Sequence, residues 1–280
     1  LAVRRGKSLI GMQDIEDAFM KVLTGPQKKS RKMLESERRN TAYHEAGHAI
    51  VGYYMPTQDP VHMISIIPAG QTLGVTVSIP TTDKFSVYRS ELNERIAMIL
   101  GGRVAEMLTF GDFSGGASND IQRATSIAHS MVTQLGMSDV LGPIRYGSSH
   151  GDDIFRGRDF ATQPDYSEET AAQIDAEVHR IVNEAFEAAK KILTEHADKL
   201  KFVAEYLLEH ETMDGDQFNA VMDHDATAEE LEKIAEDKKR RSSEANKAQA
   251  EADEKEKAEA EKKENAPEEA ESGETAQSPE

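Results

Sequence analysis

The chain has 280 residues, 38% of them hydrophobic and 30% charged, which is enough apolar material for one or two packed domains. Its formal net charge of −18 argues against a nucleic-acid partner, because phosphate binding needs a basic surface. Cysteine is absent, so disulfides and thiolate metal sites are excluded, and any metal must be held by His, Asp or Glu.

The first residues, LAVRRGKSLI, lack the long apolar core and the cleavage site of a signal peptide, and no apolar run in the chain approaches the roughly 20 residues that span a bilayer. A predicted helix follows, with Ile15, Phe19 and Val22 on one face, and it ends at Gly25 and Pro26. Because the chain begins without Met, we expect a piece of a longer protein, with this helix closing a domain whose remainder lies elsewhere.

The central part of the sequence is predicted to be mainly helical with a small sheet. A helix is expected over residues 36–55, since Pro56 breaks it, and two short strands rich in β-branched residues follow at 62–68 and 73–80. Further helical patterns then come in this order: residues 86–110, 119–135, 167–210 and 215–222.

The last part of the chain has a different composition. From about Glu229 it is rich in Glu, Lys and Ala and almost without aromatic or β-branched residues, so it cannot bury enough apolar surface to offset chain entropy. We expect residues 226–280 to form an acidic, charge-rich tail that is disordered or transiently helical.

Two histidines four residues apart, with a glutamate beside the first, stand in TAYHEAGHAI. On a helix His44 and His48 share one face and can bind one tetrahedral ion, while Glu45 can take a proton from a water on that ion. A plainer interpretation has two exposed histidines and a solvated carboxylate. Two features favour the metal site: Gly47 in mid-helix indicates close packing, and the neighbouring residues predict a buried helix. These neighbours are Ala42, Ala46, Ala49, Ile50 and Val51.

A helix of this kind supplies two ligands, so a third must come from elsewhere. The metzincin pattern is excluded, because Val51 and Tyr54 stand where a glycine and a third histidine would be needed. A thermolysin-like site needs a glutamate a short helix further on, but no carboxylate occurs between Asp59 and Asp83. Later residues remain as candidates: Glu91, Glu94, Glu106, Asp112, Asp120 and His129.

Asp120 is the best placed of these candidates on local grounds. It lies in the first turn of a predicted helix, where Ser118 can cap and where the helix dipole favours a carboxylate. Glu106 is its rival, because it stands in the apolar run GGRVAEMLTF and must be either buried and paired or at a helix edge. Spacing leaves the choice between the two open.

Several blocks of the sequence resemble the FtsH-type ATP-dependent zinc metalloproteases: AYHEAGHAIVGY, DPVHMISIIPAGQTLGVTVSIP, LGGRVAEMLTFG, GGASNDIQRAT and VTQLGMSDVLGPIRY. They stand in that family's order and at similar spacing, over roughly residues 1–225. The resemblance implies a helical zinc metallopeptidase domain. It also implies a membrane-anchored homohexamer, in which an AAA ATPase unfolds protein substrates and threads them to a ring of peptidases.

The resemblance also assigns roles to residues of this chain. His44 and His48 match the two zinc histidines, Glu45 the catalytic glutamate, and Asp120 the aspartate that is the third ligand. Glu106 matches a glutamate of the family's GGR-x-AE block, and we expect it to hydrogen-bond near the metal histidines from behind the ligands. The chain departs from the family pattern at Met107, where a second glutamate is usual, and at Gly115, where threonine is common.

No phosphate-binding loop of the G-x-x-x-x-G-K-[ST] type occurs, so ATP and Mg²⁺ are expected only in an ATPase domain outside this chain. We expect residues 1–28 to be the end of the ATPase lid, residues 29–225 the zinc metalloprotease domain, and residues 226–280 the tail. The resemblance further implies that the full-length protein lies at the cytoplasmic face of the cell membrane, anchored by a segment N-terminal to this chain. The fragment itself is expected to be soluble.

The expected activity is that of a zinc metalloendopeptidase. It would hydrolyse peptide bonds of unfolded or threaded polypeptides with a zinc-activated water and Glu45 as the general base, as part of a protease that degrades membrane and soluble proteins for quality control. The alternatives are a non-catalytic oligomerisation scaffold around a structural metal and an aminopeptidase for small peptides.

A strand that could hold the substrate is also visible in the sequence. Gly70, Leu73, Gly74 and Val75 lie in or beside the second predicted strand, and the glycines would allow an extended peptide to approach and pair with its edge. The alternative is an internal strand with a bulge at Gly74.

Overall fold

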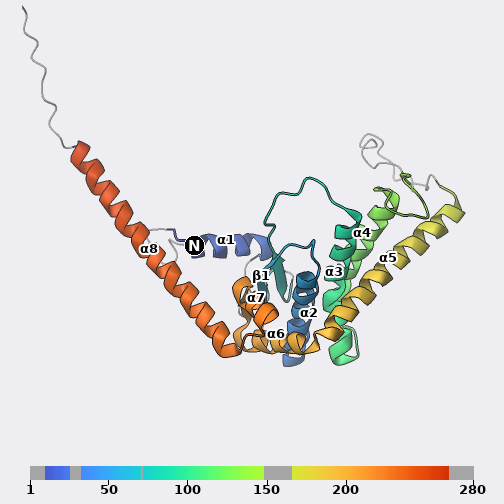
Figure 1. Cartoon of the computed structure of the whole chain (residues 1–280), viewed down its shortest axis with the longest axis horizontal. Helices are drawn as coiled ribbons and strands as arrows, with labels where there is room; N and C mark the ends of the chain where they lie inside the picture. The colour runs from blue at the N-terminus through green and yellow to red at the C-terminus, as the bar shows by residue number, and fades with distance from the viewer. Residues whose placement is uncertain (1–9, 26–32, 71, 148–165, 265–280) are drawn as a thin grey trace, which may run out of the picture. The chain divides into compact units, whose positions relative to one another are not determined.

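The computed structural model describes residues 10–25, 33–70, 72–147 and 166–264 of the chain (Figure 1). The described parts of residues 21–234 pack together as one unit, and those of the segments 1–20 and 235–280 form another. The predicted fold class, mainly α with a small β-sheet, is confirmed. The second helix and the β-sheet of the larger unit position the candidate site, so this unit is described first.

Two long helices form the centre of this unit, α2 (Glu35–Tyr54) and α3 (Arg89–Phe110). They cross at glycines, because a Cβ atom on Gly47 would lie 2.5 Å from the carbonyl oxygen of Gly101, and one on Gly101 would lie 2.7 Å from that of Gly47. The expected close packing at Gly47 is therefore confirmed. The small and apolar neighbours in α2 are fully buried, as the sequence predicted: Ala42, Ala46, Ala49, Ile50 and Val51.

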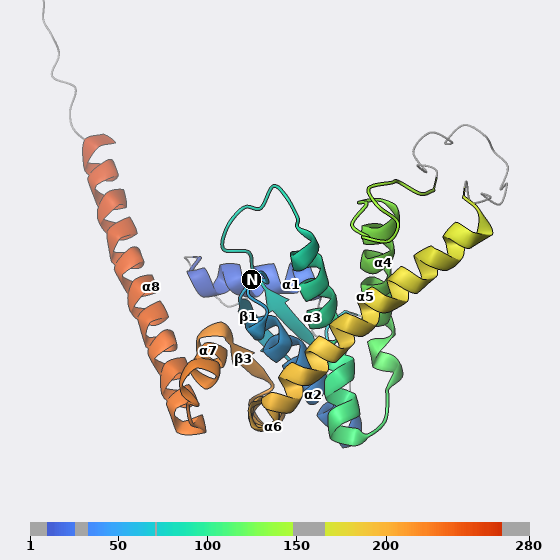
Figure 2. The same ribbon diagram turned by 45° about the vertical axis from the view of Figure 1, so that its right-hand side comes forward.

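Three further helices cover this pair. Helix α4 (Ser118–Thr133) and helix α5 (Glu168–Glu195) pack against α3, and α6 (Ala197–His210) packs against α2. Figure 2 shows α5 running alongside α3 and α4. A short 3₁₀ helix, η2 (Gly115–Ala117), leads directly into α4. These helices bury the far side of α3, so that its other side is free to face the histidines of α2.

The sheet has three antiparallel strands in the order β2-β1-β3. Strands β1 (Val61–Ser65) and β2 (Val75–Ser78) were predicted, whereas β3 (Thr212–Asp214), which precedes α7 (Gly215–His224), is too short for a sequence pattern to reveal. The bulge lies in β1, between Val61 and Met63, and Gly74 just precedes β2. The alternative of an internal strand with a bulge at Gly74 is therefore wrong, because β2 lies at the edge of the sheet formed by the described strands.

The two ends of the chain are helical where they are described. Helix α1 (Met12–Thr24) has the predicted apolar residues Ile15, Phe19 and Val22, and all three are exposed. None of the helices in the described ranges is both long and apolar enough to cross a membrane.

Helix α8 (Ala228–Glu264) occupies most of the segment for which we expected a disordered or transiently helical tail. The composition of these residues favours a helix, because Ala, Glu and Lys are strong helix formers and ion pairs such as that of Arg240 with Asp237, at 2.9 Å, add to helix stability. The start of α8 belongs to the larger unit, since Leu231 is fully buried and its carbonyl oxygen accepts a hydrogen bond from the side chain of Gln217. Residues 265–280 lie outside the described ranges.

The glycine crossing leads to a test of stability. We expect Gly101→Ala to lower the free energy of unfolding by about 1–3 kcal/mol, since the added methyl meets the backbone of Gly47 and overpacked cores lose about this much. Chemical denaturation measures it. Gly115→Ala is the matched control, because a Cβ atom there meets nothing within 4 Å. An unchanged stability of Gly101→Ala would contradict the tight crossing.

Candidate metal centre

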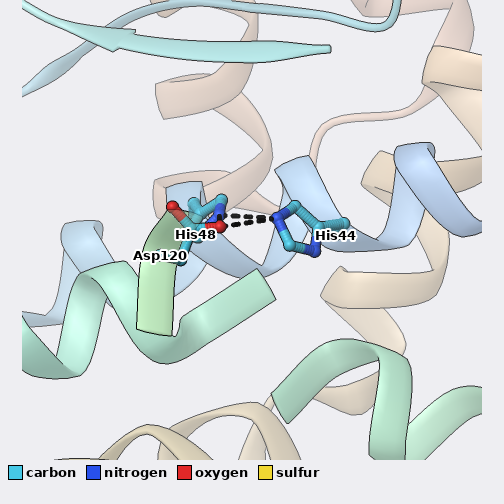
Figure 3. A group of neighbouring side chains, drawn as sticks. All are labelled: His44, His48 and Asp120. Atoms are coloured by element: carbon cyan, nitrogen blue, oxygen red, sulfur yellow. Dashed lines mark hydrogen bonds and ion pairs between the residues drawn. The ribbon is translucent and has the colours of Figure 1, made fainter. Parts of the chain in front are cut away.

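His44 and His48 lie one turn apart on α2 and point toward the same place (Figure 3). Their Nε2 atoms are 3.0 Å apart. Both side chains are largely buried, with exposed fractions of 12% and 14%. The helix is continuous through Gly47, so the spacing of four residues is what brings the two rings together.

Asp120 comes to the same point from the first turn of α4. The 3₁₀ helix before it is capped by Ser114, whose Oγ accepts a hydrogen bond from the amide of Gly116 at 3.2 Å. The expected cap at Ser118 is wrong, because Ser118 is already the first residue of α4 and the preceding 3₁₀ turn, rather than a capping side chain, starts the helix. Asp120 is thus placed by a turn that begins at Ser114.

The three donor atoms have the spacing of a metal site. Asp120 Oδ2 lies 3.2 Å from His44 Nε2 and 3.5 Å from His48 Nε2. Four donors bound about 2.0–2.1 Å from a tetrahedral zinc ion lie about 3.3 Å from one another. Within the ranges that the structure describes, this is the one group of three or more such side chains whose ligand atoms lie within 4.8 Å of one another. The residues therefore fit a zinc ion, with one tetrahedral position left over.

The other ring nitrogens fix which atoms can bind a metal. His48 Nδ1 lies 2.9 Å from the carbonyl oxygen of Met98, which can only accept, so we assign the proton to Nδ1. His44 Nδ1 lies 2.8 Å from Glu106 Oε1 and is assigned in the same way. With a proton on each Nδ1, both rings turn Nε2 toward Asp120, and the three converging atoms can hold either a proton or a metal ion between them.

Glu106 lies behind His44 and not among the converging donors. Its side chain is 1% exposed and accepts hydrogen bonds from Asn40 Nδ2 at 3.2 Å, from the Ser114 amide at 2.9 Å and from Ser114 Oγ at 3.0 Å. One buried carboxylate therefore contacts both His44 and the turn that leads to Asp120. Of the two alternatives from the sequence, the structure brings Asp120 to the histidines and Glu106 to the opposite side of a histidine ring.

The remaining ligand candidates have other partners in the structure. Glu91 is 3.1 Å from the ammonium of Lys84, Glu94 accepts from Thr57, and Asp112 caps the following amide. His129 lies 3.4 Å from Thr133 Oγ1 in α4. None of these side chains joins the group formed by His44, His48 and Asp120.

Comparison with known proteins agrees with this geometry. Residues 31–221 match the model of peptidase family M41, which covers the helices and strands that form the site. The chain belongs to peptidase family M41. The histidine pair and the carboxylate from α4 thus lie in an FtsH-type peptidase domain, and the resemblance inferred from the sequence blocks is confirmed.

Similar proteins include three bacterial ones. The chain is 49% identical over 224 residues to ATP-dependent zinc metalloprotease FtsH 3 of Symbiobacterium thermophilum, covering 80% of this chain and 36% of that protein. It is 48% identical over 223 residues to FtsH 1 of Conexibacter woesei, covering 80% and 34%, and 46% identical over 224 residues to FtsH of Bacillus subtilis, covering 80% and 35%. The chain spans about a third of the length of these curated relatives.

The site brings the buried side chains of His44, Asp120 and Glu106 close together, and their contacts shift the pKa values of His44 and Asp120. Burial opposes protonation of His44, but hydrogen bonds to Asp120 and Glu106 outweigh it and raise its pKa to about 10. Burial would raise the pKa of Asp120, yet hydrogen bonds from His44 and His48 hold it well below its usual range. His44 thus keeps an additional proton when no metal is bound, and a metal ion must compete with that proton for the site.

Glu45 lies on the side of α2 that faces the sheet. It is 7% exposed, and Thr76 Oγ1 donates a hydrogen bond to its Oε2 at 2.7 Å. Burial raises the pKa of Glu45, and the nearby His48 and His44 oppose that shift. A buried carboxylate beside the converging donors can take up and release a proton next to a bound ion.

One residue of the predicted substrate strand, Gly74, lies against Glu45. A Cβ atom on Gly74 would come within 2.8 Å of Glu45 Cγ, and Val75 pairs with Ser65 of β1. Gly70 adopts a positive φ of 55°, in the turn that joins the strands, and Leu73 is half-buried. Of this set, the structure brings Gly74 to the candidate site.

Three residues that support the site were not predicted from the sequence: Thr76, Met98 and Gly102. Thr76 could have been found from the strand period of two, which puts it on the same face as Gly74. Met98, Gly102 and Glu106 are spaced by four along α3, and a Cβ atom on Gly102 would lie 2.6 Å from the Nε2 atoms of both histidines. The spacing of four points to a role at the histidines only once α3 is known to pack against α2.

The position of Glu106 predicts a loss of metal affinity in its variant. We expect Glu106→Gln to bind zinc about 10- to 100-fold more weakly, because groups that orient metal-binding histidines have effects of this size. Competition with a zinc indicator measures the affinity. Glu91→Gln is the matched control, a buried glutamate at the other end of α3 that pairs with Lys84, and its zinc affinity should not change. Equal affinities of the two variants would show that Glu106 has no such role.

Proposed function

We propose that this chain is a zinc metalloendopeptidase domain that hydrolyses peptide bonds of unfolded polypeptides. His44, His48 and Asp120 would hold the zinc ion, and Glu45 would act as the general base. The observation that carries the proposal is the triangle of donor atoms, 3.0, 3.2 and 3.5 Å on its sides, beside a buried carboxylate that is not part of it. Three donors and one open position are typical of catalytic zinc sites.

A bound zinc ion would supply Lewis acidity, which makes a water more acidic and polarises a peptide carbonyl. Glu45 takes the proton of the attacking water and passes it to the departing amine. Glu106 and the Met98 carbonyl keep both histidine rings turned so that Nε2 faces inward. The carboxylates of Glu45 and Glu106 are buried, so bulk water has little access to them.

Strand β2 supports a proposal for substrate binding. In the described part of the chain β2 pairs with β1 on one side, so its other edge can pair with an extended peptide. Gly74 brings the strand close to Glu45, and Gly70, Leu73 and Val75 lie along the same segment. Main-chain pairing of this kind would give weak sequence preference, which suits an enzyme for unfolded chains.

The relatives support a wider proposal. They are named ATP-dependent zinc metalloproteases, and this chain corresponds to about a third of their length. We propose that residues 1–28 end an ATPase lid, residues 29–225 form the zinc metalloprotease domain, and residues 226–280 form an acidic, charge-rich tail. The full-length protein would be a membrane-anchored homohexamer at the cytoplasmic face of the membrane, using ATP and Mg²⁺ in its ATPase domain to unfold membrane and soluble proteins.

A scaffold role around a structural ion has less support. Structural zinc sites are closed by four protein ligands, whereas the group found in the described ranges has three.

Substitution of Glu45 tests the proposed function. We expect Glu45→Gln to keep zinc binding and to lower the rate of cleavage of an end-blocked, casein-like polypeptide by at least about 100-fold, because general acid–base groups contribute about 10²–10⁴. Zinc content and cleavage are measured on the same sample. Glu35→Gln, an exposed glutamate of the same helix, should cleave normally. Normal cleavage by Glu45→Gln would refute the proposed mechanism.

A further inference from the structure

Thr76 is the second residue of strand β2 and makes a short contact with the carboxylate of Glu45. Its Oγ1 lies 2.7 Å from Glu45 Oε2 and 3.1 Å from the Glu45 carbonyl oxygen. A hydroxyl has one proton to donate, and the shorter, charge-assisted contact to the carboxylate is the stronger of the two. Among the described residues, Thr76 is the one side chain found to donate a hydrogen bond to this carboxylate.

Gly74 also packs closely against the side chain of Glu45. Gly74 and Thr76 are two residues apart and lie on one face of the strand segment. A Cβ atom on Gly74 would come within 2.8 Å of Glu45 Cγ and 2.9 Å of Glu45 Oε1. The strand therefore packs along the stem of Glu45 with its backbone and holds one carboxylate oxygen with a hydroxyl.

We propose that Thr76 is a positioning residue for Glu45. Its hydrogen bond to Oε2 fixes the plane of the carboxylate and leaves Oε1 as the oxygen that takes and releases the proton. This inference rests on the proposed function of Glu45 as the general base. Because Thr76 belongs to the edge strand, the element proposed to hold the peptide also sets the orientation of the base.

The kinetic test replaces the hydroxyl without changing the shape of the side chain. We expect Thr76→Val in the zinc-loaded chain to lower kcat for an end-blocked unfolded polypeptide about 10- to 100-fold, as for loss of a hydrogen bond to a charged group. KM and zinc affinity should not change. Thr76→Ser, which keeps the hydroxyl, should restore most of kcat.

A matched control separates this role from a general loss of stability. Thr57 donates a hydrogen bond from its hydroxyl to Glu94 Oε2, so it forms the same chemical pair away from the candidate metal centre. Thr57→Val should leave kcat at the parent value. An unchanged kcat in Thr76→Val, a Thr76→Ser variant as slow as Thr76→Val, or an equal loss of kcat in Thr57→Val would overturn the proposal.

A second measurement does not depend on catalysis. A double-mutant cycle of Thr76→Val and Glu45→Ala, followed by chemical unfolding of the zinc-loaded chain, should show non-additive shifts of the unfolding midpoint, since contacting residues couple. Additive shifts would contradict the hydrogen bond. The two proposals fail separately: normal cleavage by Glu45→Gln refutes the base, whereas full kcat in Thr76→Val beside an inactive Glu45→Gln refutes only the role of Thr76.

Discussion

The close crossing of α2 and α3 is the constraint on which the candidate metal centre depends. Neither Gly47 nor Gly101 has room for a methyl group, so the two backbones touch at this point. The next residue of α3, Gly102, then lies directly against both histidine rings. One turn away on either side, Met98 and Glu106 meet the Nδ1 atoms of His48 and His44. A stripe of residues with a spacing of four on α3 thus matches a histidine pair with the same spacing on α2.

Each remaining part of the site is brought by a different element. Helix α4 brings Asp120 through the turn at Ser114, which Glu106 also holds, so that one carboxylate links a histidine to the third donor. Strand β2 holds Glu45 through the hydroxyl of Thr76. The carboxylate that we propose as the general base and the side chains that we propose as metal ligands therefore have separate supports. This separation lets one buried region contain several carboxylates, because each is paired with its own donors.

Local patterns predicted the parts of the structure that local interactions determine. The helix that carries His44, Glu45 and His48, its buried face and two of the three strands of the sheet all followed from residue spacing. The third donor did not, since Asp120 lies 76 residues from His44 and meets it only through packing. Ser118 was expected to cap α4, but a 3₁₀ turn had already begun the helix. Strand β3 was missed because three residues show no period.

A crystal structure of the zinc-loaded chain tests the central claim most directly. We predict one carboxylate oxygen of Asp120 about 2.0–2.2 Å from zinc, the Nε2 atoms of His44 and His48 about 2.0–2.1 Å from it, and solvent in the fourth position. Glu106 should remain bonded to His44 Nδ1, outside the coordination sphere. Direct coordination by Glu106 in place of Asp120, or a fourth protein ligand that closes the site, would contradict the account.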